Sequence, residues 1–239
     1  LATAAAAEKG GEIDKETCVI CIGPVVAPVE LPCGHAYCGK CLSELRKHGV
    51  AQVCPQCRVD LPPGVDGLYD LAERAYQRIQ GMVDRGEASW WLLPAELQEE
   101  MDEAVAMLTE AAAQGHMGAQ FRLGWLFDSG SGVVQDYDRA FELYTQAALQ
   151  GHAPSQYNLG CMYEGHGQGC ERSYERAAEW FAKAVEHWGH PHAQNNLGDC
   201  YRDGIGVPQD SKRALELYKL SAAQGNEYGE YNAEWMARG

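Results

Sequence analysis

The sequence contains no apolar run of about 18 residues, so we expect no helix that spans a bilayer. Its opening stretch also lacks the apolar core of a secretion signal, and we expect a disordered or weakly helical tail over residues 1–15. Basic residues are scarce, because 19 Lys and Arg stand against 34 Asp and Glu, which gives a net charge of −15. Such an acidic surface repels phosphate groups and argues against nucleic acid or an anionic membrane as partner.

Signatures of common catalytic chemistry are also missing from the sequence. No Gly-rich phosphate-binding loop, catalytic triad or paired-carboxylate motif stands out. Hydrophobic residues make up 46% of the 239 residues, which is enough to form folded cores. These features leave clustered residues and internal repeats as the informative patterns.

Cysteine is distributed very unevenly along the chain. Seven of the ten cysteines lie between Cys18 and Cys57, whereas Cys161, Cys170 and Cys200 are scattered. A secreted disulfide scaffold would spread its cysteines, while close pairs favour metal ligands. We therefore expect a reducing compartment, the cytoplasm or the nucleus, and we interpret the scattered cysteines as packing residues.

Eight potential zinc ligands follow one another in this segment. Their order is Cys18, Cys21, Cys33, His35, Cys38, Cys41, Cys54 and Cys57. Structural zinc takes four thiolate or imidazole ligands, so this set predicts two zinc ions per chain. About 45 residues form too small an apolar core to fold alone, and zinc binding would supply much of the folding free energy.

This order of three cysteines, one histidine and four cysteines resembles the RING finger family over residues 16–60. The resemblance implies a small α+β domain with interleaved, cross-brace pairing of its ligands. One zinc site would use Cys18, Cys21, Cys38 and Cys41, and the other Cys33, His35, Cys54 and Cys57. A zinc-stapled domain without activity is the alternative.

Active RING fingers bind a ubiquitin-conjugating enzyme, and the resemblance implies which residues would do so here. The apolar contacts of the family match Ile20, Leu45 and Pro55, although many members carry Trp at the position of Leu45. Arg58 matches a basic residue that bridges the conjugating enzyme and its attached ubiquitin, which orients the thioester for attack. An ordinary surface arginine is the alternative for Arg58.

The rest of the chain repeats. Three similar stretches begin at Ala119, Ser155 and Ala193, and each reads as two helices with an apolar stripe. The pattern resembles the Sel-1-like repeat, a relative of the tetratricopeptide repeats, over residues 101–239, with three full units and a half unit at each end. The resemblance implies an all-α solenoid whose concave surface binds a protein substrate or adaptor.

One glycine recurs in the middle of each first helix, within the dipeptide Leu-Gly. These are Gly124, Gly160 and Gly198. Each costs roughly 1 kcal/mol of helix stability against alanine. Their recurrence predicts close approach of the paired second helix.

The connector over residues 61–100 contains an amphipathic helix between Leu68 and Val83. We expect Trp90 and Trp91, which follow it, to cover the core of the first repeat; an exposed docking patch is the alternative. His187, His190 and His192 have loop-like spacing, and we interpret them as surface residues rather than as a third metal site.

Two hypotheses for function follow from these patterns. The first is a RING-type E3 ubiquitin ligase that recruits a ubiquitin-conjugating enzyme and transfers ubiquitin to a substrate held by the repeats. The second is a non-enzymatic zinc-binding adaptor or scaffold. They differ in whether any conjugating enzyme is productively engaged.

Overall fold

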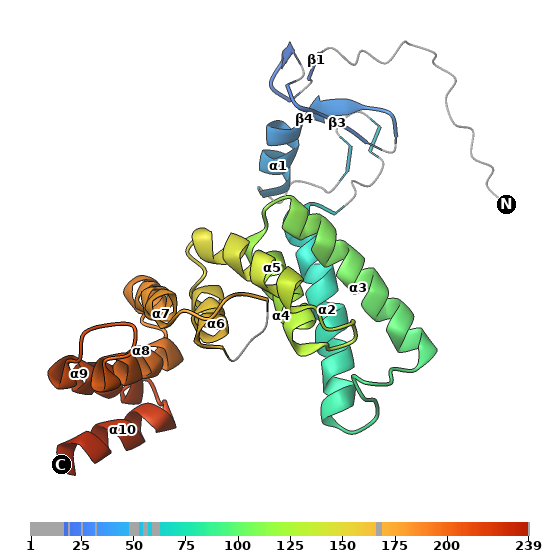
Figure 1. The fold of residues 1–239 in the computed structure, drawn as a ribbon. Coiled ribbons are helices and arrows are strands. Elements are labelled where there is room, and N and C mark those ends of the chain that lie inside the picture. Colours follow the sequence, from blue (N-terminus) through green and yellow to red (C-terminus); the bar gives the residue numbers. More distant parts are fainter. Residues whose placement is uncertain are drawn as a thin grey trace. The chain divides into compact units, whose positions relative to one another are not determined.

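The structure is a computed structural model that describes residues 17–18, 20–24, 26–31, 33–47, 53–54, 57–58, 63–165 and 169–238. The chain divides into two compact units, residues 1–64 and residues 65–239 (Figure 1). We refer to them as the N-terminal unit and the helical unit.

Short strands and one helix form the described part of the N-terminal unit. They are β1 (Thr17–Cys18), β2 (Gly23–Pro24), β3 (Pro28–Glu30), β4 (Ala36–Cys38) and α1 (Gly39–Lys47). β1 pairs with β2 and β3 with β4, both antiparallel. The buried core consists of Leu31, Tyr37 and Leu42 together with Cys18, Cys38 and Cys54. Half of these core residues are predicted metal ligands, so metal binding would be coupled to formation of this core.

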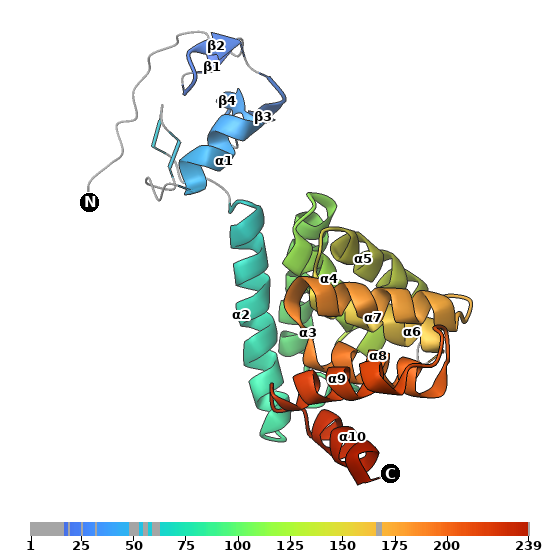
Figure 2. The same ribbon diagram turned by 90° about the vertical axis from the view of Figure 1, so that its left-hand side faces the viewer.

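The described part of the helical unit consists of helices joined by short connections. They are α2 (Val65–Asp84), α3 (Ala95–Ala113), α4 (Met117–Ser129), α5 (Tyr137–Leu149), α6 (Ala153–Glu164), α7 (Tyr174–Trp188), α8 (Pro191–Asp203), α9 (Ser211–Ala222) and α10 (Glu227–Arg238). Figure 2 shows α5, α7 and α9 following one another, with α10 after them. The packing of successive helix pairs confirms the predicted all-α solenoid.

The recurring glycines lie where the two helices of a pair touch. The pairs are Gly124 with Tyr144, Gly160 with Phe181, and Gly198 with Tyr218. A Cβ atom added at Gly198 would lie 2.6 Å from Cε1 of the Tyr218 ring, which is closer than real Cβ contacts. The predicted packing role of these glycines is thereby confirmed, because only a residue without a side chain admits the buried ring.

Side chains cap the helices of each repeat in a regular way. The second helices begin after Asp136, Ser173 and Asp210, whose side chains accept backbone N–H groups. The first helices begin after His116, His152 and His190, which accept through Nδ1. The sequence interpretation missed the role of these histidines and took His190 for a simple surface residue. The signal was present, because each directly follows a helix-ending glycine.

α2 packs against α3 and contributes buried residues to the same core as α4 and α5. Arg122 of α4 donates two hydrogen bonds to Glu73 of α2, at 2.6 and 2.8 Å, and lies over the ring of Tyr76. Such a fork-to-carboxylate pair fixes the register of the two helices. α2 therefore provides the half repeat that contains α3 with a partner helix.

The two adjacent tryptophans behave differently from one another. Trp90 stacks on Tyr76 at 5.6 Å and is partly buried against the core, as predicted. The prediction for Trp91 is wrong, because this residue is 84% exposed. The chain turns tightly between Ser89 and Leu92, so consecutive side chains point in different directions and only one can reach the core.

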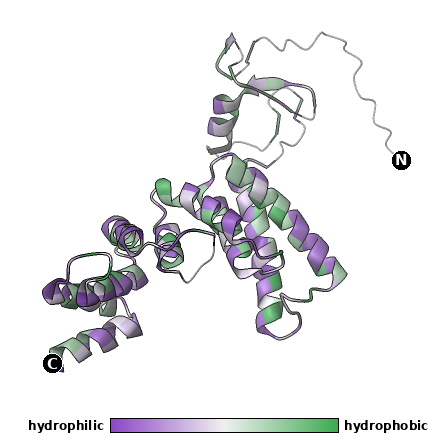
Figure 3. Ribbon diagram, in the orientation of Figure 1, coloured by the Kyte–Doolittle hydropathy of each residue, from purple (hydrophilic) through white to green (hydrophobic). Residues whose placement is uncertain are grey.

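Polar and apolar residues are interleaved along the helices (Figure 3). Among the described residues, no helix is both long enough and apolar enough to cross a membrane. The apolar positions instead form the stripes by which one helix packs on the next.

Candidate metal centre

The eight predicted ligands form two groups in the N-terminal unit. Cys18, Cys21, Cys38 and Cys41 make one group, and Cys33, His35, Cys54 and Cys57 make the other. Within each group the ligand atoms all lie within 4.8 Å of one another. The pairing is interleaved along the sequence, as the resemblance to RING fingers implied.

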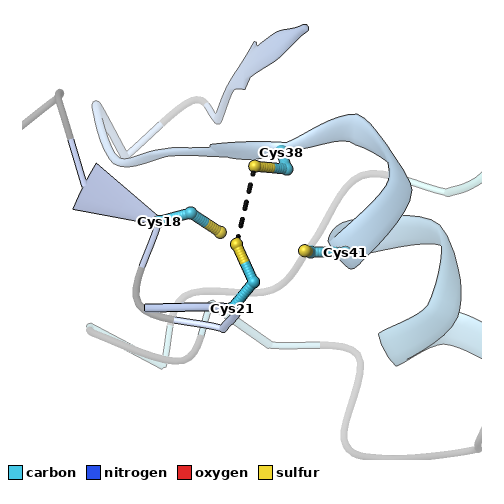
Figure 4. Close-up of side chains that lie close together, drawn as sticks. All are labelled: Cys18, Cys21, Cys38 and Cys41. Carbon is cyan, nitrogen blue, oxygen red and sulfur yellow. Dashed lines mark hydrogen bonds between the residues drawn. The ribbon is translucent and has the colours of Figure 1, made fainter. Parts of the chain in front are cut away.

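In the first group, the four sulfurs come from different elements and converge. Cys18 ends β1, Cys21 lies in the following turn, Cys38 ends β4 and Cys41 lies in the first turn of α1. Figure 4 shows the four side chains pointing toward one another, with Cys21 Sγ and Cys38 Sγ 3.9 Å apart. Two sulfurs of a zinc tetrahedron with bonds of about 2.3 Å lie about 3.8 Å apart, so this spacing fits a zinc ion.

The second group presents one imidazole nitrogen to its thiols. Nδ1 of His35 lies 3.5 Å from Sγ of Cys33 and 3.7 Å from Sγ of Cys54. These distances match the edges of a tetrahedron around zinc, and they assign Nδ1 as the ligand atom. The proton of a neutral His35 then resides on Nε2.

Two of the three Cys-x-x-Cys pairs, Cys18/Cys21 and Cys54/Cys57, are closed in the same manner. The N–H of Ile22 donates to the carbonyl of Cys18, and the N–H of Arg58 donates to the carbonyl of Cys54, each at 2.8 Å. Ile22 and Arg58 directly follow the second cysteine of their turns and have positive φ values of 56° and 60°. L-residues adopt this conformation at a cost, which the surrounding turn must offset.

Neighbouring groups support the ligands from outside the two sites. The hydroxyl of buried Tyr37 lies 3.1 Å from Sγ of Cys54, and the N–H of Val26 donates to Sγ of Cys38 at 3.2 Å. Donors of this kind stabilise thiolates and orient them toward a metal. The sequence interpretation missed Tyr37, although an aromatic residue between two ligands in a strand was a visible signal.

Crowding separates the pKa values of the thiols in the first group. Burial and the neighbouring thiols of Cys21 and Cys18 raise the pKa of Cys41 to about 12. At Cys18, burial acts in the same direction but is outweighed by hydrogen bonds to backbone groups of Cys38 and Cys21, which lower the pKa to about 6. Without a cation, the repulsion between neighbouring thiolates prevents all four thiols from losing their protons. A bound dication would offset that repulsion and take the place of the protons.

The residues predicted to contact a conjugating enzyme lie at the edge of the core. Ile20 and Leu45 are both half-buried and pack against the same cluster as the metal ligands. Arg58 is exposed. Pro55 lies outside the described residues.

Comparison with known families identifies both units. The family "Zinc finger, C3HC4 type (RING finger)" matches residues 18–57. The family "Sel1 repeat" matches residues 98–116, 118–152, 153–187 and 191–226, which together make up about half of the chain.

Curated relatives that match part of this chain are E3 ubiquitin-protein ligases. E3 ubiquitin-protein ligase TRIM21 of Bos taurus is 29% identical over 125 residues, which covers 42% of this chain and 26% of the relative. E3 ubiquitin-protein ligase TRIM65 of Homo sapiens is 42% identical over 59 residues, which covers 25% of this chain and 11% of the relative. The chain therefore spans about a quarter or less of these relatives.

Solved structures resemble the helical repeats. A protective antigen of uropathogenic Escherichia coli strains, displaying an SLR fold, matches with a TM-score of 0.59 and 28% identity over 79% of this chain and 34% of its own. A Sel1 repeat protein from Oxalobacter formigenes matches with a TM-score of 0.50 and 34% identity over 54% of this chain and 96% of its own. The fold of the helical unit agrees with these structures.

Proposed function

The chain belongs to the Sel1 repeat family and carries a C3HC4-type RING finger, and from this premise we propose that it is an E3 ubiquitin-protein ligase. The observation that carries the proposal is the interleaved grouping of the eight ligands. The RING finger family matches residues 18–57, and curated relatives of the chain are E3 ubiquitin-protein ligases. The gathering of seven cysteines into two metal-ligand groups suits a reducing compartment, the cytoplasm or the nucleus.

Two zinc ions would be held by the two ligand groups and would act structurally, because each site has four protein ligands and no open position. No cysteine of the finger is then a free nucleophile. The chemistry is a direct transfer: a substrate lysine amine attacks the thioester carbonyl of charged ubiquitin, an isopeptide bond forms, and the thiolate of the conjugating enzyme leaves.

The residues of this chain would bind and orient the charged conjugating enzyme. Ile20, Leu45 and Pro55 would supply the apolar contact surface. Arg58 would bridge the conjugating enzyme and ubiquitin through its exposed guanidinium, whose planar fork suits two hydrogen bonds at once. The concave surface of the repeats would hold a protein substrate or an adaptor.

The test is ubiquitin autoconjugation with a panel of conjugating enzymes, beside a Cys33→Ser, His35→Ala variant. Chains formed by the natural protein but not by the variant support a zinc-dependent ligase. Silence across the panel, with two zinc ions measured per folded chain, would refute the ligase and support the adaptor. Leu45 favours that second candidate, because leucine offers less apolar area to a conjugating enzyme than tryptophan does.

Arg58 is tested separately by discharge of ubiquitin from a charged conjugating enzyme to free lysine. We expect Arg58→Ala to retain its zinc and to slow discharge at least roughly tenfold, since orientation of the thioester is lost. Arg74→Ala is the matched control, because Arg74 is an exposed arginine on α2. Discharge by Arg58→Ala at the natural rate would remove the bridging role.

A further inference from the structure

A groove of about 590 Å³ opens on the helical unit, between the connection from α2 to α3 and the connection from α4 to α5. Its walls include Trp91 and Val134, which are 84% and 87% exposed, and Asp102 of α3. In Figure 1 the connection from α2 to α3 joins the lower ends of these two helices. Large apolar side chains this exposed at one groove are a mark of an interaction site.

The groove is built on a fixed support. Trp90 forms part of the lining and stacks almost parallel on the buried ring of Tyr76, with an interplanar angle of 7°. Gln98 of α3 donates to the carbonyl of Gly132 at 3.1 Å and to Oδ1 of Asp102 at 2.8 Å, which ties the opposite loop to α3. A wall held in this way loses little conformational entropy when a ligand binds.

The charge beside the groove is of one sign. α3 carries Glu96, Glu99, Glu100, Asp102, Glu103 and Glu110 and no Lys, Arg or His. Among the described residues, Glu100 is the only acidic residue of α3 that forms an ion pair, and its partner is Arg78. Glu99, Asp102 and Glu103 are exposed, and no basic residue lines the groove.

We propose that this groove binds a short segment of a partner protein that carries an apolar side chain next to Lys or Arg. The apolar side chain would lie against Trp91 and Val134. The cation would lie over the indole face of Trp91 and beside the carboxylate of Asp102. A second copy of this chain fits less well, because the net charge of −15 makes two copies repel one another.

This assignment rests on the proposed function, because it names the place where the helical unit would hold a substrate or adaptor. Binding to the groove is measured without any ubiquitin chemistry. Loss of peptide binding and loss of autoconjugation are therefore separate results.

The test is selection of phage-displayed random 12-residue peptides on the zinc-loaded full chain, followed by fluorescence anisotropy of the enriched peptides. We expect enriched sequences to contain Lys or Arg beside an apolar residue. We expect Trp91→Ala to weaken their binding at least tenfold and Asp102→Asn to weaken it about threefold, with a shallower salt dependence. The controls Trp235→Ala and Glu186→Gln, which alter exposed residues on α10 and α7, should bind as the natural protein does.

Three results would overturn the assignment. They are the absence of any enriched sequence, enriched peptides without basic residues, and equal binding to Trp91→Ala. Self-association that sedimentation detects in the natural chain but not in Trp91→Ala would instead assign the groove to a second copy. Because Trp91 is almost fully exposed, its replacement should leave the helical circular dichroism unchanged, which separates lost binding from lost folding.

Discussion

Replacement of Gly198 by alanine is the sharpest test of how the repeats pack. Gly198 lies in the middle of α8, where alanine alone would favour the helix by roughly 1 kcal/mol. The added Cβ would lie 2.6 Å from Cε1 and 2.9 Å from Cδ1 of Tyr218. The sign of the effect therefore depends on whether that ring can move away.

The ring of Tyr218 is held at both ends. Its body is fully buried against α8, and its hydroxyl donates to Oδ1 of Asp199 at 2.8 Å and accepts from Arg202 at 3.1 Å. Overpacking of a core by one methyl group costs typically about 1–3 kcal/mol, and the immobile ring places this case toward the upper end. After the gain in helix propensity, we expect the free energy of unfolding to fall by about 1–2 kcal/mol.

The measurement is urea unfolding followed by circular dichroism at 222 nm. Gly81→Ala is the matched control, because Gly81 lies within α2 and its added Cβ would meet only the flexible end of Arg85 at 3.4 Å. We expect this control to gain up to about 1 kcal/mol. If Gly198→Ala were as stable as the natural protein or more so, the close approach of helix and ring would be refuted.

Two further predictions concern protons and metal. Burial, with His192 and His152 nearby, lowers the pKa of His190 to about 4, so the capping form of this histidine is neutral. The unfolded chain binds the proton more readily, so the free energy of unfolding should fall as the pH drops from about 6.5 toward 4, by about 1–3 kcal/mol for this partly exposed histidine. His190→Asn keeps a capping side chain that does not titrate. If the free energy of unfolding depended on pH equally in this variant and in the natural protein, the reasoning would be contradicted. Removal of zinc by a chelator should expose the seven thiols of the two ligand groups to a thiol reagent while the helical signal at 222 nm largely remains. Equal reactivity of those thiols before chelation would refute metal binding.

The sequence predicts the helical unit well because the same packing contact recurs in each repeat and requires the same residue types at the same spacing. Leu-Gly recurs wherever an aromatic ring must touch the first helix, so composition and spacing report a three-dimensional contact directly. The zinc ligands can be predicted from the sequence equally well, since few residue types bind zinc and the spacing of the ligands is constrained. In both cases one physical requirement fixes one residue type at one position.

The prediction for Trp91 failed because hydrophobicity alone does not determine direction. Trp90 and Trp91 are the same residue type, but because the chain turns tightly here, Trp90 packs on Tyr76 and Trp91 points toward solvent. The histidine caps were missed for a related reason. Histidine has several roles in proteins, and its neutral Nδ1 acts as a cap only in a backbone geometry that the residue type itself does not reveal.

Arg58 connects the metal sites to the proposed activity. It follows Cys57 with φ of 60°, as Ile22 follows Cys21 with φ of 56°, and both N–H groups close a cysteine turn. The turn that brings Cys54 and Cys57 to one ion therefore also sets the direction in which Arg58 leaves the backbone. Loss of the second zinc would misplace Arg58 and abolish transfer together with the fold of the finger, whereas Arg58→Ala would abolish the bridge alone. Zinc content measured beside discharge rates thus separates positioning by the fold from action by the guanidinium.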